Sequence, residues 1–298
     1  MAVKLFTKQF AGLLPNIYEK NAHFLRTFGG TVQVKDGVKD SDTFLSMKTT
    51  DTEVVIQEYD TGANVAFGTG TGNSSRFGPR HEVKSVDHQV EYDAPLAIHD
   101  GVDNFTVNDV ADEVIAERLA LHGEEWTEHL NGVLGKLISD SASETLTGEL
   151  TPEGVAKVFA QAHKAMVNNK VSKRLERVAY VNADVYNLIV DNNLATSAKQ
   201  SSANIDNQSV YKFKGFILEE LADDYFQEGE QAYFAADNVG VVGIGISVAR
   251  AIDSEDFAGV AIQGAAKYGK YLPEKNRKAV LKASFTEAAS EVEPTPEG

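Results

Sequence analysis

Residues 61–80 read TGANVAFGTGTGNSSRFGPR, and six of these twenty positions are glycine or proline. This composition predicts a flexible loop, and a loop of this length is uncommon in a compact domain unless it is functional or disordered. Before it, Thr52–Tyr59 is rich in β-branched residues; after it, Val86–Tyr92 alternates apolar with polar residues. Both patterns are typical of strands. We therefore predict a long two-stranded hairpin, which needs a partner surface because two strands alone are marginally stable.

The strongest helical pattern follows this hairpin and reaches Ile138. Thr106 or Asn108 can cap the helix, and acidic residues crowd its first turns, where the helix dipole favours negative charge. Its apolar residues recur with a roughly helical period: Val110, Val114, Leu119, Trp126, Leu130, Val133 and Leu137. About 30 residues at about 1.5 Å each give a rod of roughly 45 Å. Glycines at positions 123, 132 and 135 weaken the helix, so we expect close neighbours or a bend.

A second module is predicted beyond residue 141. Thr151-Pro152-Glu153 is typical of a helix start with proline at the first helical position. The apolar face of that helix comprises Val155, Val158, Phe159, Ala162 and Met166. Asn182 is a candidate cap for the next helix, and residues 196–209 form a polar loop. Strands are predicted at Val178–Val181, Phe216–Leu221, Gln231–Ala236, Val239–Val248, Ala258–Ala266 and Lys278–Ala283. The fold class is therefore α+β.

Composition and charge restrict the function. The chain has 298 residues, 42% of them hydrophobic, and no cysteine, which excludes disulfides, thiolate nucleophiles and cysteine-bound metals. A net charge of −16 disfavours a broad nucleic-acid surface. Residues 1–30 are basic, with Lys4, Lys8, Lys20 and Arg26 against Glu19. This arm either docks on an acidic surface, such as that of a neighbouring copy, or is a solvated terminus. No apolar run is long enough to span a membrane and no secretory signal is evident, so we expect the protein to stay in the cytoplasm.

Glycine and histidine patterns offer two candidate sites. The run Gly68–Gly72 lacks the Lys-Ser/Thr of a nucleotide-binding loop. His122, Glu125 and His129 share one face of the long helix and could together hold a metal. No third histidine lies nearby in the sequence, so a solvated helix face is the preferred interpretation.

Acidic clusters are the remaining candidates. Glu219, Glu220, Asp223 and Asp224 lack the alternating spacing of a calcium loop. Asp253–Asp256 has the composition of a turn before a strand, which we favour over a catalytic dyad. We therefore predict no catalytic residue, no metal and no cofactor, and a structural protein that is not an enzyme.

The order of parts resembles a known family. A basic arm, a long glycine-tipped hairpin, a long helix and a mixed module closed by late strands are similar to the major capsid protein of tailed bacteriophages, the Hong Kong 97-like fold. The most specific likeness is the run ARAIDSEDFAGVAIQG at residues 249–264, followed by KYGKY at 267–271 and NRKAV at 276–280. These runs look like the closing strands of capsid proteins from phages of Gram-positive hosts. The resemblance covers residues 1–285.

This resemblance implies a division of the chain. The N-terminal arm is 1–30, the extended E-loop is 51–92, the peripheral domain is 31–50, 93–140 and 247–285, the axial domain is 141–246, and a disordered acidic tail is 286–298. The long helix becomes the spine helix of the peripheral domain, and the arm lies across a neighbouring subunit. Candidate contacts between subunits are Arg76, Arg80, Phe67, Phe77, Lys4 and Lys8, and the two arginines are expected to pair with a neighbour's acids. Some members cross-link through an E-loop lysine, but residues 61–80 contain none, so we expect closure without covalent links.

The implied partners are those of a phage head. Copies of the chain would form hexamers and pentamers of an icosahedral shell that encloses double-stranded DNA, contacted only non-specifically. A portal protein is expected, and a separate scaffolding protein, because the long N-terminal scaffolding segment of many members is missing. The protein would be assembled in the host cytoplasm and located in the virion, without a membrane. The alternatives are an encapsulin-type nanocompartment shell and a metal-dependent α/β enzyme using the acidic cluster or the helix histidines.

Overall fold

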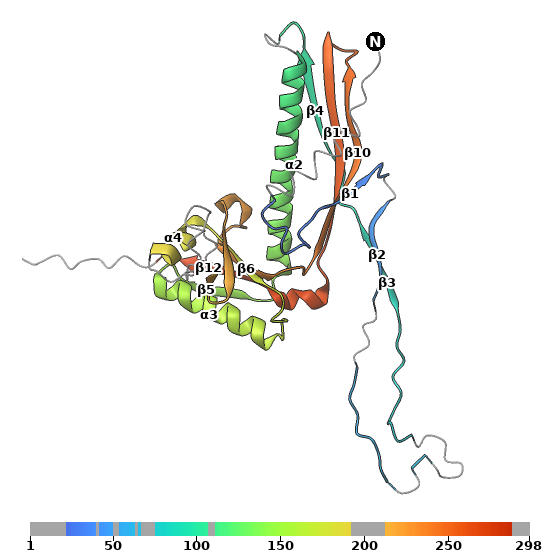
Figure 1. Cartoon of the computed structure of the whole chain (residues 1–298), viewed down its shortest axis with the longest axis vertical. Helices are drawn as coiled ribbons and strands as arrows, with labels where there is room; N and C mark the ends of the chain where they lie inside the picture. The colour runs from blue at the N-terminus through green and yellow to red at the C-terminus, as the bar shows by residue number, and fades with distance from the viewer. Residues whose placement is uncertain are drawn as a thin grey trace, which may run out of the picture. The chain divides into compact units, whose positions relative to one another are not determined.

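The computed structural model separates into two units (Figure 1). It describes residues 22–39, 42–49, 54–62, 65–66, 75–106, 111–191 and 212–287. We call Thr43–Glu91 the hairpin unit and the remainder of the chain the body. The two units are described separately.

The body contains a four-stranded sheet with the order β1-β10-β11-β4. Its strands are β1 (Gln33–Asp36), β10 (Val241–Asp253), β11 (Gly259–Tyr271) and β4 (Leu96–Asp103). β1 is parallel to β10, and the other pairs are antiparallel. β10 and β11 extend beyond the predicted strands, and the predicted turn at Asp253–Asp256 joins them, closed by a hydrogen bond from Ser254 N to Gly259 O of 2.9 Å.

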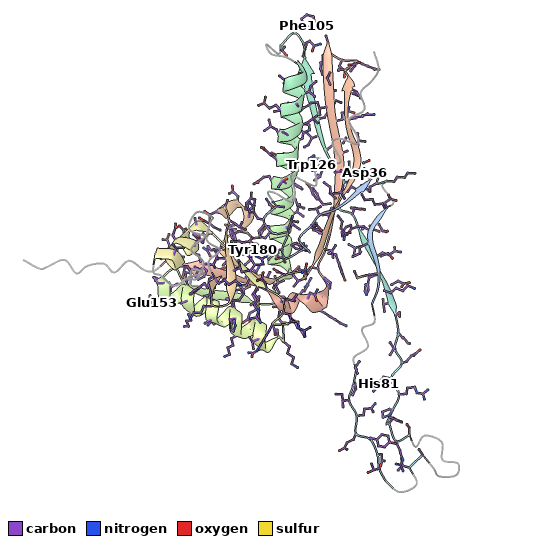
Figure 2. The ribbon with its side chains drawn as sticks, viewed as in Figure 1. Asp36, His81, Phe105, Trp126, Glu153 and Tyr180 are labelled. Atoms are coloured by element: carbon purple, nitrogen blue, oxygen red, sulfur yellow. The ribbon has the colours of Figure 1, made fainter. Side chains whose placement is uncertain are left out.

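The long helix α2 (Ala111–Ser141) runs alongside this sheet (Figure 1). Ile115 packs with Val102 of β4 and Ile262 of β11, and the Trp126 ring lies 5.9 Å from that of Tyr268 (Figure 2). The large apolar residues buried along its C-terminal half lie four positions apart: Trp126, Leu130, Leu134 and Ile138. The predicted helix is confirmed and extends to Ser141, whereas the candidate cap Asn108 lies outside the described residues. No helix in the described ranges is long and apolar enough to cross a membrane.

Close packing explains one glycine of this helix. A Cβ at Gly135 would collide with the carbonyl oxygen of Tyr225 and lie 3.5 Å from the Phe24 ring. A Cβ at Gly132 would meet no atom within 4 Å. The expected close neighbour therefore exists at Gly135 and not at Gly132.

The body also contains a six-stranded sheet with the order β5-β12-β9-β6-β8-β7. Its strands are β5 (Thr145–Glu149), β12 (Val280–Thr286), β9 (Ala232–Ala236), β6 (Arg177–Val181), β8 (Phe216–Glu220) and β7 (Lys212–Phe213). Helices α3 (Pro152–Asn168) and α4 (Ala183–Asp191) contribute to its core, in which the Phe159 ring lies 4.9 Å from those of Phe213 and Phe234.

Local signals placed both helices correctly. Thr151 caps α3 by accepting a hydrogen bond from Gly154 N (3.1 Å), and the five predicted face residues are its buried residues. Asn182 caps α4 by accepting from Val185 N (3.1 Å). The predicted loop at 196–209 lies outside the described residues.

Two segments pair with strands across the expected domain limits. Residues 241–246 were placed in the axial domain, yet they belong to β10 of the four-stranded sheet. Residues 280–285 were placed in the peripheral domain, yet β12 is hydrogen-bonded between β5 and β9 of the six-stranded sheet. Both segments pair with strands far away in sequence, which local patterns do not reveal. The expected tail begins within β12 at Thr286, and residues 288–298 lie outside the described part.

The hairpin unit contains one strand pair, β2 (Thr43–Thr49) with β3 (Val86–Glu91), in antiparallel register. The predicted strand at 86–92 is confirmed. The predicted strand at Thr52–Tyr59 is wrong for its described residues 54–59, because the partner of β3 lies upstream at 43–49. A β-branched run favours extended backbone, but pairing decides whether that backbone forms a ladder.

Candidate assembly surfaces

Beyond its strand pair, the hairpin unit continues as two extended arms, residues 54–62 and 75–85. Isolated contacts join them. Asp60 N donates to Arg76 O (2.9 Å), and Gln57 Nε2 donates to Pro79 O (3.0 Å). The Tyr59 and Phe77 rings meet edge to face, 5.1 Å apart. The two arms are therefore held together by a few isolated contacts and not by a ladder of backbone hydrogen bonds.

The predicted contact residues of this unit have different surroundings. The Arg76 side chain is half-buried, and its Nε donates to the Val65 carbonyl oxygen (3.0 Å), so it helps to shape its own loop. Phe77 is 74% exposed and Arg80 is exposed. Phe67 lies outside the described residues, as do Lys4 and Lys8 of the arm.

Exposed apolar side chains concentrate on the hairpin unit. It holds seven of the twelve exposed large hydrophobic residues in the described part: Val54, Val55, Ile56, Tyr59, Phe77, Val83 and Val86. Val54 and Ile56 are 95% and 96% exposed, and none of the unit's described residues is buried. Fully burying one such side chain contributes about 1.5–3 kcal/mol. Burial of these side chains against another surface would therefore be favourable.

The residues that lead out of the N-terminal arm pack into their own chain. Phe24, Leu25 and Phe28 are buried in the core shared by both sheets, and Thr27 Oγ1 lies 2.9 Å from the hydroxyl of Tyr180, a residue of β6 (Figure 2). The expectation that all of 1–30 lies across a neighbour is therefore wrong for 22–30. Phe24 and Phe28 are apolar anchors that the charge pattern did not reveal.

Arg26 holds this segment to three carboxylates of the body. Its Nη2 lies 2.7 Å from Glu176 Oε2, its Nε donates to Asp237 Oδ1 (3.3 Å), and its Nη1 lies 3.7 Å from Glu219 Oε1. Partial burial disfavours the charge of Arg26, but the hydrogen bonds and charges of the carboxylates outweigh burial and raise its pKa. Burial raises the pKa of Glu219 to about 7, opposed by Arg26 and assisted by the charge of Asp237. Arg26 thus meets an acidic surface of its own chain, whereas Lys4, Lys8 and Lys20 lie outside the described residues.

His122 does not lie on a solvated helix face. Its ring is buried and lies 2.8 Å from Asp100 Oδ2 of β4, while Arg118 Nη2 lies 2.6 Å from the same oxygen. The hydrogen bond from His122, followed by that from Arg118, lowers the pKa of Asp100. The solvated interpretation was wrong at this position because β4 was not predicted and its carboxylate could not be placed. Glu125 and His129 are exposed.

Another polar network links α2 to the six-stranded sheet. Lys282 Nζ donates to Glu230 Oε1 (2.6 Å), Ser139 Oγ donates to the same oxygen (2.9 Å), and Tyr233 donates to Oε2 (2.7 Å). Burial alone would raise the pKa of Glu230, but these hydrogen bonds lower it. The network provides hydrogen-bond donors to both oxygens of the Glu230 carboxylate, whose side chain is only 10% exposed.

The described residues offer no metal centre. Within them, no group of three or more histidine, aspartate or glutamate residues is placed to hold an ion. In the acidic cluster, Asp223 accepts a hydrogen bond from Asn182 (3.0 Å), and Glu219 faces Arg26. Val54 and Ile56, whose side chains are almost fully exposed, were not among the predicted contact residues. Their signal was an apolar run that does not alternate with polar residues.

Comparison with known proteins identifies the fold. No protein-family model and no curated protein matches this sequence. A chain of the mature capsid of bacteriophage PhiM1 is similar at 12% identity with a TM-score of 0.60, over 89% of this chain and 87% of that one. The capsid of Ralstonia phage GP4 is similar at 12% identity with a TM-score of 0.59, over 93% of each chain. A structure of Mycobacterium phage Che8 is similar at 16% identity with a TM-score of 0.56, over 82% of this chain and 85% of that one. The sequence-based resemblance is confirmed at the level of the fold: the chain has the fold of bacteriophage capsid proteins.

Proposed function

We propose that the chain is the major capsid protein of a tailed bacteriophage, whose copies form the hexamers and pentamers of an icosahedral head around double-stranded DNA. The observation that carries this proposal is the hairpin unit, in which Val54 and Ile56 are almost fully exposed and no described residue is buried. Such a surface needs a partner, and a shared fold with phage capsid proteins supports other copies of this chain as that partner.

The parts of the chain take the following roles in this proposal. The hairpin unit is the E-loop that lies on a neighbouring subunit, and α2 is the spine helix. The four-stranded sheet belongs to the peripheral domain and the six-stranded sheet to the axial domain. Residues 1–21 supply the arm that reaches a neighbour. We expect closure to be non-covalent, since residues 61–80 contain no lysine. Lys48 and Lys84 lie outside this range and form exposed ion pairs with Asp87 (3.7 Å) and Glu82 (3.4 Å).

A separate scaffolding protein, a portal protein and packaged DNA complete the proposed assembly, which forms in the host cytoplasm and ends in the virion. Co-expression distinguishes this function from an encapsulin-type shell. A nanocompartment forms regular closed particles from the chain alone, whereas the proposed head protein needs the scaffolding protein for regular particles. Electron microscopy of both preparations is the test. Failure to form closed particles in either preparation would overturn a shell function altogether.

Substitution of Ile56 tests the part of the hairpin unit in assembly. Ile56→Asn removes an exposed apolar side chain, so the folded chain should persist while each subunit contact loses about 1.5–3 kcal/mol, which is tenfold or more in affinity. We expect sedimentation to show capsomers or free subunits in place of shells. Ile56→Leu, which keeps the apolar area, should assemble normally. If Ile56→Asn forms shells with unchanged resistance to urea, the hairpin unit is not the contact.

A further inference from the structure

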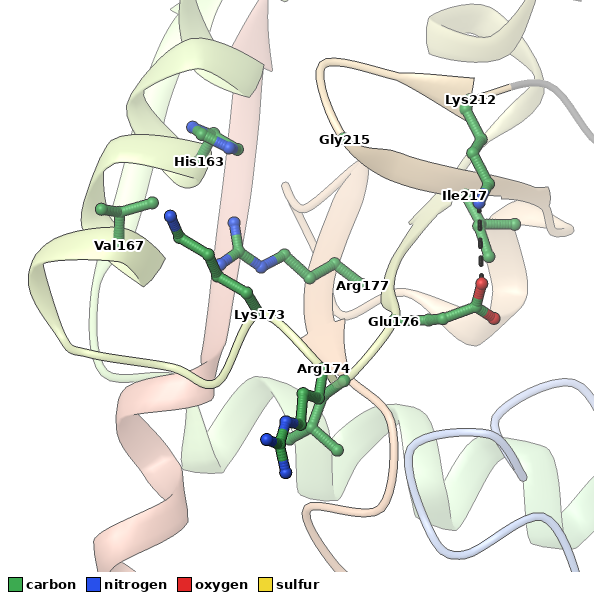
Figure 3. A pocket seen from close by; sticks show the side chains of 10 residues that line it. His163, Val167, Lys173, Arg174, Glu176, Arg177, Lys212, Gly215 and Ile217 are labelled. Atoms are coloured by element: carbon green, nitrogen blue, oxygen red, sulfur yellow. Dashed lines mark ion pairs between the residues drawn. The ribbon is translucent and has the colours of Figure 1, made fainter.

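A pocket on the body is lined by three segments that are distant in sequence (Figure 3). α3 contributes His163 and Val167, the connection into β6 contributes 173–177, and the β7–β8 hairpin contributes Lys212, Gly215 and Ile217. Its volume is about 560 Å³. The turn at Gly215 approaches α3 closely, because a Cβ there would lie 3.4 Å from the His163 ring, and its φ of +89° suits glycine. The hairpin turn therefore forms one wall directly against the histidine.

Positive charge dominates this pocket in an otherwise acidic protein. Its lining includes Lys173, Arg174, Arg177 and Lys212 against the single carboxylate of Glu176. Glu176 lies 2.7 Å from Arg26 Nη2 and also pairs with Lys212 of the lining, 3.6 Å from its Nζ (Figure 3). Lys173, Arg174 and Arg177 remain, so the net charge of the lining is positive.

Arg177 is the unusual member of the lining. It is the first residue of β6, paired with Ala236 of β9, and only 8% exposed. Among the described residues, no carboxylate or other acceptor is paired with its guanidinium. Burial lowers the pKa of Arg177, and no acidic neighbour opposes this effect. β6 fixes the backbone of Arg177, and its side chain lines the pocket without an ion-pair partner among the described residues, so the guanidinium is available to a ligand.

The side chains around Arg177 converge. Figure 3 shows the Arg177 guanidinium and the Lys173 ammonium extending toward the same space beside the His163 ring, while Arg174 points away. A planar guanidinium offers two parallel donors to oxyanions, and an ammonium adds a point charge. Two cations and an imidazole around one space suit a ligand with several acceptor oxygens and more than one negative charge.

We propose that this pocket binds a phosphate group. Phosphate carries up to two negative charges and more acceptor oxygens than a carboxylate, so it satisfies Arg177 and Lys173 together. Free inorganic phosphate presents this chemistry in one group, whereas a nucleic-acid backbone presents it through adjacent phosphodiesters, each with one negative charge and two free oxygens. Recognition of a backbone phosphate carries no sequence preference, because the groups contacted are the same at every base. The inference concerns the folded chain and does not depend on shell formation.

Binding of two probes to the purified full-length chain tests the proposal. Inorganic phosphate is titrated by calorimetry, and a fluorescent DNA duplex is titrated by anisotropy at fixed salt. Lys173→Gln and Arg177→Gln should each weaken phosphate binding at least tenfold. Lys157→Gln, which removes the same charge from an exposed position of α3 outside the pocket, should leave it unchanged. Lys173 is exposed, so its variant keeps the test valid if Arg177→Gln fails to fold.

The two probes identify the source of the phosphate. If the duplex binds, competes with inorganic phosphate and weakens with Lys173→Gln, the ligand is a nucleic-acid backbone. If only inorganic phosphate binds with this variant pattern, the ligand is the free ion, and the proposal also stands. Absence of binding by both probes overturns it, as does an equal loss with Lys157→Gln. Binding of a polyglutamate peptide without phosphate binding also overturns it and assigns the pocket to an acidic protein segment.

Discussion

Glu219 gives the stability of the body a dependence on pH near neutrality. Its side chain is 27% exposed and faces Arg26 of the N-terminal segment, Asp237 after β9 and Tyr180 of β6. Burial raises its pKa from 4.5 to about 7. A carboxyl group with a raised pKa in the folded state contributes its full stability below pH 4.5, where both states are protonated. That contribution is lost as pH rises through about 7.

The structure sets the size of this effect. Each pKa unit corresponds to about 1.4 kcal/mol, so the shift of Glu219 corresponds to about 3 kcal/mol between pH 4.5 and pH 8. Glu219→Gln keeps a neutral side chain at every pH. We therefore expect the variant to gain up to about 3 kcal/mol relative to the native chain as pH is raised across this window.

Urea denaturation of the unassembled chain measures this difference. Trp126 is the only tryptophan and is 4% exposed, so its fluorescence reports unfolding of the core that also holds Phe24. Glu220→Gln, on the exposed side of the same strand, is the matched control. The difference in free energy of unfolding between this variant and the native chain should be the same at pH 5 and pH 8. A constant difference between Glu219→Gln and the native chain at pH 5 and pH 8 would refute the reasoning.

Two further substitutions test packing and polar satisfaction. Lys282→Met leaves the carboxylate of Glu230 without its cation, so the free energy of unfolding should fall by about 3 kcal/mol in urea titrations, whereas Lys278→Met at an exposed site should be nearly neutral. If Lys282→Met changes the free energy of unfolding only slightly, the prediction is wrong, and the hydrogen bonds from Ser139 and Tyr233 are enough to stabilise the Glu230 carboxylate. Gly135→Ala should lower the thermal midpoint because its Cβ meets a backbone carbonyl, while Gly132→Ala, in open space, should stabilise by up to about 1 kcal/mol. Equal behaviour of the two alanine variants would contradict the packing described for α2.

Signals within a few residues predicted much of the fold. The cap and proline at Thr151 and Pro152 located α3, and the periodicity around Trp126 located α2. The strand at 52–59 was predicted wrongly because its β-branched run has no ladder partner among the described residues. β-propensity describes the preferred backbone conformation of one segment, whereas a strand in a sheet also requires a second segment to pair with.

The candidate assembly surfaces were predictable only in part. The glycine-rich run at 61–80 indicated a protruding hairpin, but the exposure of Val54 and Ile56 depends on which segment pairs with β3. The environments of His122 and Arg177 depend on Asp100 and on the β7–β8 hairpin, both far away in sequence. The surroundings of such residues are set by tertiary neighbours, which local sequence patterns do not specify.

The place of β12 has a consequence for synthesis of the protein. Residues 280–286 lie between β5 and β9, so the six-stranded sheet remains interrupted until these residues have left the ribosome. The hairpin unit, at 43–91, emerges much earlier with its valines and isoleucine exposed. Contacts between strands so distant in sequence form slowly, because loop closure precedes them. A nascent chain therefore exposes the apolar side chains of the hairpin unit before its body can finish folding, and during this period a chaperone would limit aggregation.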